Sequence, residues 1–553
     1  MGDCVHVAGV LNFLRLAGSL GYDTEFLGAA RSPEDLALSV REKRPDILAV
    51  GYRLNPESVT RLTERLKKAL DLQGVHPKLI FGGTPPCAEK ARDSGIFDAV
   101  FSGTEDLDEI IAYLKGETVD RTEEDYPGTL LGRISWKAPY PLLRHHFGLP
   151  SLEDTIRGIE KIADSKVLDV ISLGPDQNAQ ENFFHPEDMD PDQDGAGGVP
   201  VRTPEDFLAL YRASRRGNYP LMRCYSGTRD VLKFAQVLLN TINNAWAAIP
   251  LCWYNVLDGR GPRTVVESIR ESQAAMAWHA ERGIPVEVNE SHHWSLRDAP
   301  DSVAVAAAYL AAYNAKKMGV RDYVAQFMFN TPPGTSAIMD LGKMLAKLEL
   351  IESLADENFR VIRQVRAGLS SFPQDFGLAK GQLATSTLVS MALKPHIVHV
   401  VGFCEGDHAA TAEDVIESCK IVRGVIRNCL EGMPDLTKDE RVQERKVRLL
   451  EEARVLLDAI SSLPQIVKDL SGPEIGDPLT SPEVLAFAIK VGLLDAPHLV
   501  GNPFASGKVE TRVVGGACVA VDPVSKKTIS EKERVDSILA TIEKSELLVN
   551  VAG

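Results

Sequence analysis

Two kinds of hydrophobic pattern alternate along the chain. Short runs of apolar or β-branched residues predict buried strands, and longer stretches with apolar residues at helical spacing predict amphipathic helices. Before residue 118 we expect strands at 24–28, 46–51, 78–81 and 99–101, and helices at 10–20, 33–43, 56–72, 87–95 and 107–114. Such alternation indicates a doubly wound, Rossmann-like parallel sheet, which binds ligands beyond the C-terminal ends of its strands. We therefore assign 1–117 to a first domain.

A second region, 138–430, repeats the strand-then-helix pattern eight times. The expected strands are 141–146, 167–174, 221–226, 249–255, 284–290, 323–330, 361–368 and 397–403. The helices that follow them are expected at 152–163, 204–214, 229–246, 264–282, 299–317, 336–355, 377–392 and 411–428. Eight βα units in about 290 residues predict a (β/α)8 TIM barrel.

The remaining segments connect and extend these two regions. Residues 118–137 are acidic and rich in turn formers, which predicts an interdomain linker. The segment 431–553 predicts helices at 438–463, 482–494 and 530–547, with two strand-like runs in 500–521. The expected fold class is therefore α/β, a Rossmann-like domain followed by a TIM barrel and a C-terminal α+β extension.

The composition argues against some classes of binding partner and indicates the cellular compartment. The 553 residues carry 61 Lys and Arg against 77 Asp and Glu, a net charge of −16, which argues against a nucleic-acid or anionic-membrane surface. The sequence shows no membrane-spanning stretch and no signal peptide. The eight cysteines contain no Cys-x-x-Cys pair, which favours reduced thiols and a cytoplasmic location.

Candidate chemistry gathers where the predicted barrel strands end, as expected for a TIM-barrel active site. Polar and aromatic residues at these ends include Arg144, His146, Arg223, Tyr225, Tyr254, Asn255, Glu290, His292, His293, Arg366, Glu405 and His408. The histidines also raise the alternative of a metal hydrolase. However, the sequence has neither a His-x-His strand nor a His-Glu-x-x-His helix to support it.

The N-terminal segment resembles the cobalamin-binding domain of B12-dependent mutases and corrinoid methyltransferases. Asp3, His6 and Gly9 resemble that family's Asp-x-His-x-x-Gly loop, and Gly82-Gly83 follows a strand as the family's glycine pair does. Tyr52-Arg53-Leu54 stands where the family has Ser-x-Leu, and two residues rather than one separate Asp3 from His6. The family's strand before the loop has no counterpart in this sequence.

The resemblance implies base-off cobalamin with His6 as the lower cobalt ligand and therefore the metal-binding residue. Asp3 would tune His6, and Gly9 would let the following helix begin close to the cofactor. Leu54, Gly82, Gly83 and Thr84 complete the implied cofactor-binding set, with the glycines facing the nucleotide tail.

The barrel region resembles the large, catalytic subunit of glutamate mutases. The matching stretches occur in the same order as in that subunit: Gly227-Thr228-x-Asp230, Trp253-Tyr254-Asn255-Val256, Val288-Asn289-Glu290, Phe372-Pro373-Gln374-Asp375, 400–405 and Asn502-Pro503-Phe504-Ala505-Ser506-Gly507-Lys508. In that family the cobalamin domain is a separate chain, whereas here it would be fused ahead of the barrel.

Together the two resemblances imply an adenosylcobalamin-dependent carbon-skeleton mutase, a radical isomerase. The implied catalytic residues are Glu405, which would also hold the adenosyl ribose of the cofactor, Tyr254, Asn255 and Glu290. The implied substrate-binding residues are Arg144, His146, Arg223, Tyr225, His292 and Arg366. His146 and Tyr225 replace two arginines of the family, and Ala248 replaces a glutamate, so we expect a small carboxylic acid other than glutamate.

Two alternatives remain open from the sequence. One is a corrinoid-dependent methyltransferase, and the other is a cobalamin-binding protein, or a cobalamin-free barrel protein, without mutase activity. As partners we expect the small acid and a second copy of the chain in a homodimer, with an extra subunit or a reactivating chaperone as further candidates. Neither nucleic acid nor membrane is expected.

Overall fold

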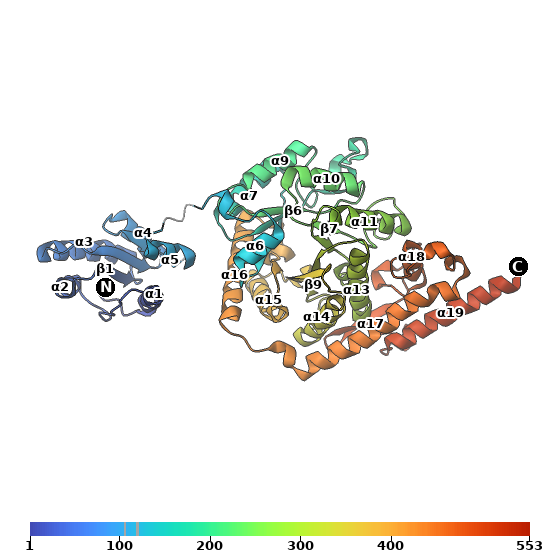
Figure 1. Cartoon of the computed structure of the whole chain (residues 1–553). Coiled ribbons are helices and arrows are strands. Elements are labelled where there is room, and N and C mark those ends of the chain that lie inside the picture. The colour runs from blue at the N-terminus through green and yellow to red at the C-terminus, as the bar shows by residue number, and fades with distance from the viewer. Residues whose placement is uncertain (104, 106, 118–120, 553) are drawn as a thin grey trace. The chain divides into compact units, whose positions relative to one another are not determined.

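The computed structural model describes residues 1–103, 105, 107–117 and 121–552 and divides into two compact units, Met1–Thr122 and Glu123–Gly553 (Figure 1). Residues 118–120 of the predicted linker lie outside the described residues. Each unit is described by itself.

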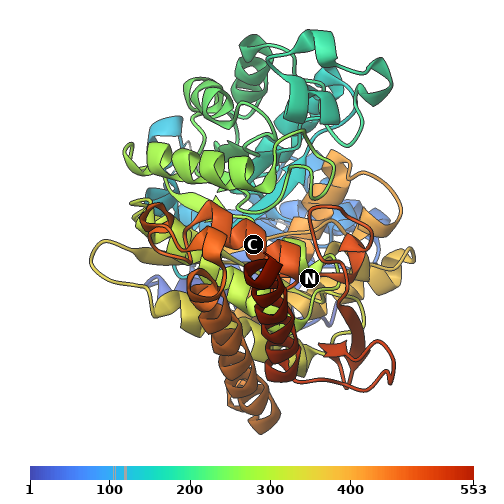
Figure 2. The ribbon, with the colours of Figure 1, turned by 90° about the vertical axis from the view of Figure 1, so that its right-hand side faces the viewer.

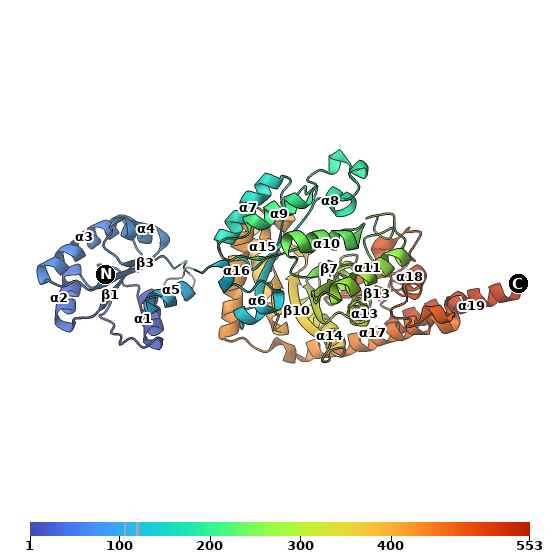
Figure 3. The same cartoon turned by 45° about the horizontal axis from the view of Figure 1, so that its top comes forward.

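Unit 1 contains a three-stranded parallel sheet in the order β1-β2-β3, with helices around it (Figure 3). Its strands are β1 (Ile47–Tyr52), β2 (Lys78–Gly83) and β3 (Ala99–Phe101). Its helices are α1 (Ala8–Ser19), α2 (Pro33–Lys43), α3 (Pro56–Gln73), α4 (Pro85–Asp93) and α5 (Leu107–Lys115). The prediction of a strand at 24–28 is wrong. That segment has no ladder partner, and most of its side chains are exposed.

Helix starts in unit 1 follow from local sequence. The Ser32 side chain accepts a hydrogen bond from the Asp35 backbone N–H, and Asn55 does the same for Glu57. A proline follows each cap at the first helical position, where its missing N–H costs nothing. These signals explain why the bounds of α2 and α3 agree so closely with the prediction.

Unit 2 contains an eight-stranded parallel sheet that forms a nearly closed, TIM-like barrel, in the order β6-β5-β4-β11-β10-β9-β8-β7. The strands are β4 (Leu142–Phe147), β5 (Val170–Leu173), β6 (Leu221–Cys224), β7 (Ala247–Ile249), β8 (Val286–Val288), β9 (Asp322–Phe329), β10 (Arg360–Ala367) and β11 (Ile397–His399). Beside the β6–β7 gap, Ala245 N–H donates to the Met222 carbonyl at 2.9 Å, and Ser226 N–H donates to the Ala248 carbonyl at 3.3 Å.

A helix follows each barrel strand, as predicted. They are α7 (Leu152–Asp164), α9 (Pro204–Ala213), α10 (Val231–Ile242), α11 (Val265–Ala280), α13 (Asp301–Lys317), α14 (Ala337–Glu352), α15 (Phe376–Ser390) and α16 (Ala412–Glu431), with the shorter α8 (Gln177–Asn182) and α12 (Ser291–Ser295) after β5 and β8. The strand predicted at 249–255 is mostly wrong, because β7 ends at Ile249. Beyond it the backbone turns, and Tyr254 has a left-handed φ of 66°.

An apolar plug closes the N-terminal end of the barrel. It consists of buried side chains from the strand starts and from α6 (Leu130–Lys137): Leu130, Leu142, Val170, Leu221, Trp246, Val324, Ile362 and Ile397. Arg133 of α6 donates hydrogen bonds to the Pro127 and Tyr219 carbonyls at 3.0 and 2.9 Å. Residues 123–137, which the sequence placed in the linker, therefore belong to the barrel unit.

The C-terminal extension packs on one side of the barrel. It contains α17 (Glu440–Ile466), α18 (Pro482–Val491), β12 (Glu510–Val514), β13 (Ala517–Val521) and α19 (Glu531–Ala552). Figures 1 and 2 show α17 and α19 side by side. Buried Asp301 of α13 binds both Lys343 of α14 and Arg445 of α17, at 3.0 and 2.7 Å. Across the described residues, no helix is long and apolar enough to cross a membrane.

Candidate functional site

A cavity of about 420 Å³ lies at the C-terminal ends of the barrel strands. Six of the residues to which the sequence assigns a catalytic or substrate-binding role line it: Arg144, His146, Tyr225, Tyr254, His292 and Arg366. The other lining residues are Arg260, Glu287, Asn289, His293, Leu296, Arg297, Gln326, Leu369 and His498. Five of the six predicted substrate-binding residues therefore share one cavity. The sixth, Arg223, is fully buried beside Tyr225.

The period of a strand explains this layer of polar side chains. Residues two apart on a strand point to the same face, so Arg144 and His146 of β4 both face the barrel interior. Gln364 and Arg366 of β10 do the same. Below this layer the plug is apolar, which leaves the polar groups of the upper layer to bond to one another or to a ligand.

Arg144 is the centre of a buried network. Its Nε donates to the Ser172 hydroxyl at 2.8 Å, and its Nη1 donates to Gln364 Oε1 at 2.8 Å and to Glu287 Oε2 at 3.4 Å. Trp246 Nε1 also donates to Glu287 Oε2, at 2.8 Å. The guanidinium groups of Arg144 and Arg223 lie over the Trp246 ring, 5.7 and 5.2 Å from its centroid.

His146 is held as a neutral acceptor. Arg144 Nη2 lies 2.9 Å from His146 Nε2, and the Tyr225 hydroxyl lies 2.9 Å from the same nitrogen. Because an arginine can only donate, Nε2 must accept, and the proton of the neutral ring resides on Nδ1. That Nδ1 is buried and has no hydrogen-bond partner in the described part of the chain. Burial and the neighbouring Arg144 lower the pKa of His146 well below its usual value.

A chain of two amides fixes the tautomer of His292 in the same way. Gln364 Oε1 accepts from Arg144, so its Nε2 donates to Gln326 Oε1 at 3.0 Å. Gln326 Nε2 then donates to His292 Nδ1 at 3.0 Å. His292 therefore carries its proton on Nε2, and burial lowers its pKa well below the usual value.

Positive charge exceeds negative charge in this site. Among the described residues lining the cavity, Glu287 is the only carboxylate. Arg223 Nη2 lies 3.9 Å from Glu287 Oε2, beyond hydrogen-bond distance, and the Nε and Nη2 of Arg223 have no hydrogen-bond partner among the described residues. Arg366 donates from Nε to the Ala367 carbonyl at 3.3 Å. Buried donors of this kind match an anionic ligand.

The cavity mouth contains a second group, in which one carboxylate, Asp258, faces two arginines. Arg297 Nη2 lies 3.2 Å from Asp258 Oδ2, and its guanidinium stacks 3.9 Å from the Trp253 ring centroid. Arg260 lies over the Tyr254 ring at 4.9 Å. Burial raises the pKa of the Tyr254 hydroxyl, which keeps it protonated. Tyr254 therefore offers a hydroxyl donor to a ligand.

The C-terminal extension also reaches the cavity. His498 lines it and lies 3.2 Å from Asp298, while Asn502 Nδ2 donates to the Leu257 carbonyl at 2.9 Å. His498 could not be identified from the sequence, because it follows the last barrel strand by about a hundred residues of helix and loop. Gln326, Gln364 and Glu287 were also missed, since each lies inside a strand rather than at its end.

Three predicted catalytic residues lie outside the cavity lining. Glu290 accepts hydrogen bonds from the Leu251 and Cys252 N–H groups at 3.1 and 3.0 Å and from Trp294 Nε1 at 2.7 Å. Asn255 binds backbone groups of its own loop. Both therefore hold the segment after β7 in shape.

Glu405 is the third, and it follows β11. Its side chain is exposed, yet the surrounding protein raises its pKa by desolvation, an effect that the positive charge of Arg366 opposes. Glu405 therefore lies within electrostatic reach of an arginine of the cavity, although it does not line the cavity itself.

In unit 1 the predicted cofactor-binding residues gather at one edge of the sheet. The Met1 ammonium donates to the Gly51 carbonyl at 2.9 Å, which fixes the N-terminal segment beside the end of β1. His6 is exposed, and its Nδ1 lies 3.8 Å from Cys4 Sγ. Asp3 does not pair with His6. It faces Tyr52, whose pKa is raised mainly by burial and further by this carboxylate.

The glycines of this edge differ in what surrounds them. A Cβ on Gly83 would lie 2.5 Å from the Tyr52 carbonyl oxygen, so this residue must be glycine for the sheet to form. A Cβ on Gly82 or Gly9 would meet nothing within 4 Å. Leu54 is exposed, and Thr84 precedes α4 without capping it. Open space therefore adjoins Gly9 and Gly82.

A separate cavity of about 400 Å³ lies within unit 1. It runs along β1 between α1, α2 and the loop at 22–31, and His6, Val10 and Gly51 are among its lining residues. Apolar side chains such as Phe13 and Leu14 also line it. A cavity of this size can take part of a bulky organic ligand.

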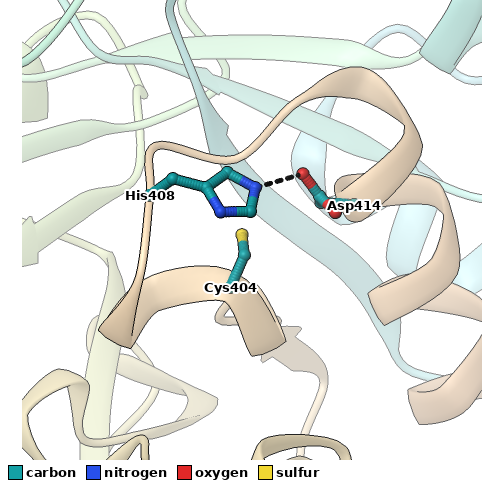
Figure 4. A group of neighbouring side chains, drawn as sticks. All are labelled: Cys404, His408 and Asp414. Carbon is teal, nitrogen blue, oxygen red and sulfur yellow. Dashed lines mark hydrogen bonds and ion pairs between the residues drawn. The ribbon is translucent and has the colours of Figure 1, made fainter. Parts of the chain in front are cut away.

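Two groups of three potential metal ligands occur among the described residues, with ligand atoms within 4.8 Å of one another. In the first, His408 Nε2 lies 3.0 Å from Asp414, and Cys404 lies below the ring (Figure 4). His408 Nδ1 is already bound to Asp407 at 2.7 Å, and burial raises the pKa of the Cys404 thiol to about 12. This group is therefore an ion-pair cluster in which the thiol stays protonated.

The second group, His185, Glu187 and Asp188, is similarly engaged. His185 Nε2 lies 2.8 Å from Asp230, and Asp188 lies 2.8 Å from Arg229. Neither group lines the barrel cavity.

Comparison with known protein families and with characterised proteins finds no match to this chain.

Proposed function

We propose that the chain is an adenosylcobalamin-dependent carbon-skeleton mutase acting on a small carboxylic acid. The observation that carries the proposal is the arginine-rich, carboxylate-poor cavity at the C-terminal end of an eight-stranded parallel barrel. TIM-barrel enzymes place their chemistry at that end. The finer identity rests on the resemblance of the barrel stretches to glutamate mutases and of the N-terminal segment to cobalamin domains.

The residues of unit 1 fit a corrinoid, with one change from the expected pattern. The exposed imidazole of His6 is accessible to a cobalt ion, and no side chain crowds Gly9 or Gly82. The cavity along β1 would take part of the nucleotide tail. Because Asp3 faces Tyr52, the neighbour of His6 Nδ1 is the Cys4 thiol instead of a carboxylate.

When bound, adenosylcobalamin would supply a carbon radical that abstracts hydrogen from the substrate. The barrel residues then have three tasks. Arg366 would bind the acid, and the positive charge of fully buried Arg223 would attract it. His146 and Tyr254 would orient the acid through N–H and O–H donors, and the closed apolar floor would exclude water. Glu405 would hold the adenosyl ribose near Arg366.

The test uses the full chain loaded with adenosylcobalamin tritiated at the 5′ carbon. We expect tritium to appear in one of a series of small carboxylic acids, because a mutase exchanges that hydrogen with its substrate. Arg366→Met should lower the transfer at least about a hundredfold, whereas the surface variant Arg157→Met on α7 should not change it. Absence of transfer to every acid that binds the barrel would contradict the proposal.

Homodimerisation, an extra subunit, a reactivating chaperone and a cytoplasmic location remain predictions. A corrinoid-dependent methyltransferase remains the alternative, and it would transfer a methyl group from methylcobalamin without exchanging tritium.

A further inference from the structure

We propose that the substrate of the barrel is a small dicarboxylic acid without an amino group. The inference rests on the proposed function for its relevance to catalysis, but its physical basis is the charge balance of the cavity alone. It names a substrate class that neither the fold nor the sequence resemblance specifies.

The arginines in and around the cavity outnumber the carboxylates near them. Glu287 carries one negative charge and faces two guanidinium groups: it is hydrogen-bonded to Arg144 and lies 3.9 Å from Arg223. Asp258 neutralises Arg297 at the mouth, and Arg260 lies 4.0 Å from the same carboxylate with a largely exposed side chain that water can solvate. Because this one carboxylate cannot neutralise the three buried guanidinium groups of Arg144, Arg223 and Arg366, two positive charges remain, and Arg223 and Arg366 have no carboxylate of their own among the described residues.

Among the described residues, no other carboxylate lies within ion-pair distance of Arg223 or Arg366. The histidines around them are neutral, because burial and the arginines lower the pKa of His146, His292 and His399 well below the usual value. Glu405 acts on Arg366 only from beyond the 4.0 Å of an ion pair. Because arginine does not deprotonate in proteins, two positive charges in this site are left for a ligand to neutralise.

The donors around this excess charge suit carboxylates. Arg223 Nε and Nη2, His146 Nδ1 and His293 Nε2 are buried, and none has a hydrogen-bond partner among the described residues. His293 Nδ1 lies 3.4 Å from Arg297 Nη1 and so accepts, which leaves the proton on Nε2. A monocarboxylate would leave one guanidinium unpaired, whereas two carboxylates would neutralise both.

Among the described lining residues, no free carboxylate is available to an ammonium group, and the unpartnered acceptor Asn289 Oδ1 is neutral. Glu287 is the only carboxylate among the described lining residues, and Arg144, Trp246 and Gln364 already occupy it. Ala248 of β7 is paired in register with Glu287, and its methyl group cannot accept a hydrogen bond. An ammonium group would therefore add a third positive charge to a site that already holds two.

Calorimetric titration of the cofactor-free full chain tests the inference. The probes are malonate, succinate, glutarate and adipate, the amino acids aspartate and glutamate, and the monocarboxylate butyrate. We expect at least one unsubstituted dicarboxylate to bind about tenfold or more tighter than its amino counterpart and than butyrate. Binding of an amino acid as tightly as its unsubstituted counterpart, or no binding by any dicarboxylate, would overturn the inference.

Variants locate the binding. Arg223→Met and Arg366→Met should each weaken dicarboxylate binding about tenfold to a hundredfold, and Arg223→Lys, which keeps the charge, should weaken it less than Arg223→Met. The exposed control Arg157→Met should bind like the wild type. Unchanged affinity in both methionine variants would also overturn the inference. Because no cobalamin is present, dicarboxylate binding by a chain that fails to bind cobalamin would refute the proposed function alone.

Discussion

Trp246 Nε1 donates a hydrogen bond to Glu287 Oε2 at 2.8 Å on the floor of the barrel cavity. The same indole ring lies under the guanidinium groups of Arg144 and Arg223. The Trp246 ring thus contacts both the buried carboxylate of Glu287 and the two guanidinium groups that this carboxylate attracts. This arrangement makes Glu287 the residue on which the stability of the cation layer depends.

Glu287→Gln should destabilise unit 2 by about 3–5 kcal/mol, because it leaves two buried guanidinium groups without their carboxylate. The measurement is urea-induced unfolding followed by tryptophan fluorescence. Glu281→Gln, an exposed glutamate just after α11, is the matched control and should change stability little. A loss below about 1 kcal/mol in Glu287→Gln would show that the carboxylate is not needed to hold the arginines.

Acidification should destabilise unit 2 through its buried histidines. The pKa of His145 is lowered to about 4, and those of His146, His292, His293 and His399 lie well below the usual value. Below pH 6.5 the unfolded chain binds protons that the folded chain does not, so stability falls as pH falls from 6.5 towards the folded pKa. For His145 the cost at pH 5.5 is about 1 kcal/mol.

The urea midpoint should therefore be lower at pH 5.5 than at pH 7.5, and His145→Gln should reduce that difference. Exposed His408 provides the opposite case, because Asp407 and Asp414 raise its pKa. It contributes stability that is present below its unfolded pKa and is lost as pH rises through the folded pKa. His408→Gln should accordingly enlarge the drop on acidification. Equal midpoints at both pH values for the wild type would refute this account.

Leu130→Ala should destabilise unit 2 by about 2–5 kcal/mol, because it opens a cavity in the plug under the barrel. Leu378→Ala, at an exposed site on α15, is the control. The same reasoning predicts that a fragment beginning at residue 123 unfolds at a higher temperature than one beginning at residue 138. Equal melting temperatures would mean that α6 is a dispensable tether, as the sequence alone suggested.

Much of the fold could be predicted from the sequence, because each barrel strand is a short apolar run bounded by an amphipathic helix. Arg144 and Arg366 of the cavity could also be predicted, since each lies on a barrel strand, whereas Arg260 and Arg297 lie in loops and could not. The roles of Glu290 and Asn255 could not be predicted, because a glutamate that binds backbone N–H groups looks the same in sequence as one that faces a ligand. The position of Asp3 near Tyr52 likewise depends on how the N-terminal segment lies on β1.

Substitutions at two adjacent glycines of unit 1 should distinguish an effect on folding from an effect on cofactor binding. Gly83→Ala should lower the melting temperature of unit 1, since the new Cβ would meet the Tyr52 carbonyl oxygen. Gly82→Ala should leave that temperature unchanged, because nothing lies within 4 Å of its Cβ, yet it should weaken cobalamin binding at least about tenfold by filling space that the cofactor needs. Wild-type cobalamin affinity in Gly82→Ala would remove Gly82 from the site.

The most direct test of the central claim is the electron paramagnetic resonance spectrum of the full chain loaded with cob(II)alamin and labelled with nitrogen-15 in its histidines. If His6 is the lower cobalt ligand, the nitrogen splitting of the cobalt lines changes from a triplet to a doublet on labelling, and His6→Ala abolishes the doublet. A triplet that persists despite the label would show that the cofactor keeps its own base as the ligand. That result, or the absence of bound cob(II)alamin, would contradict the assignment of this chain as a mutase with histidine-ligated cobalamin.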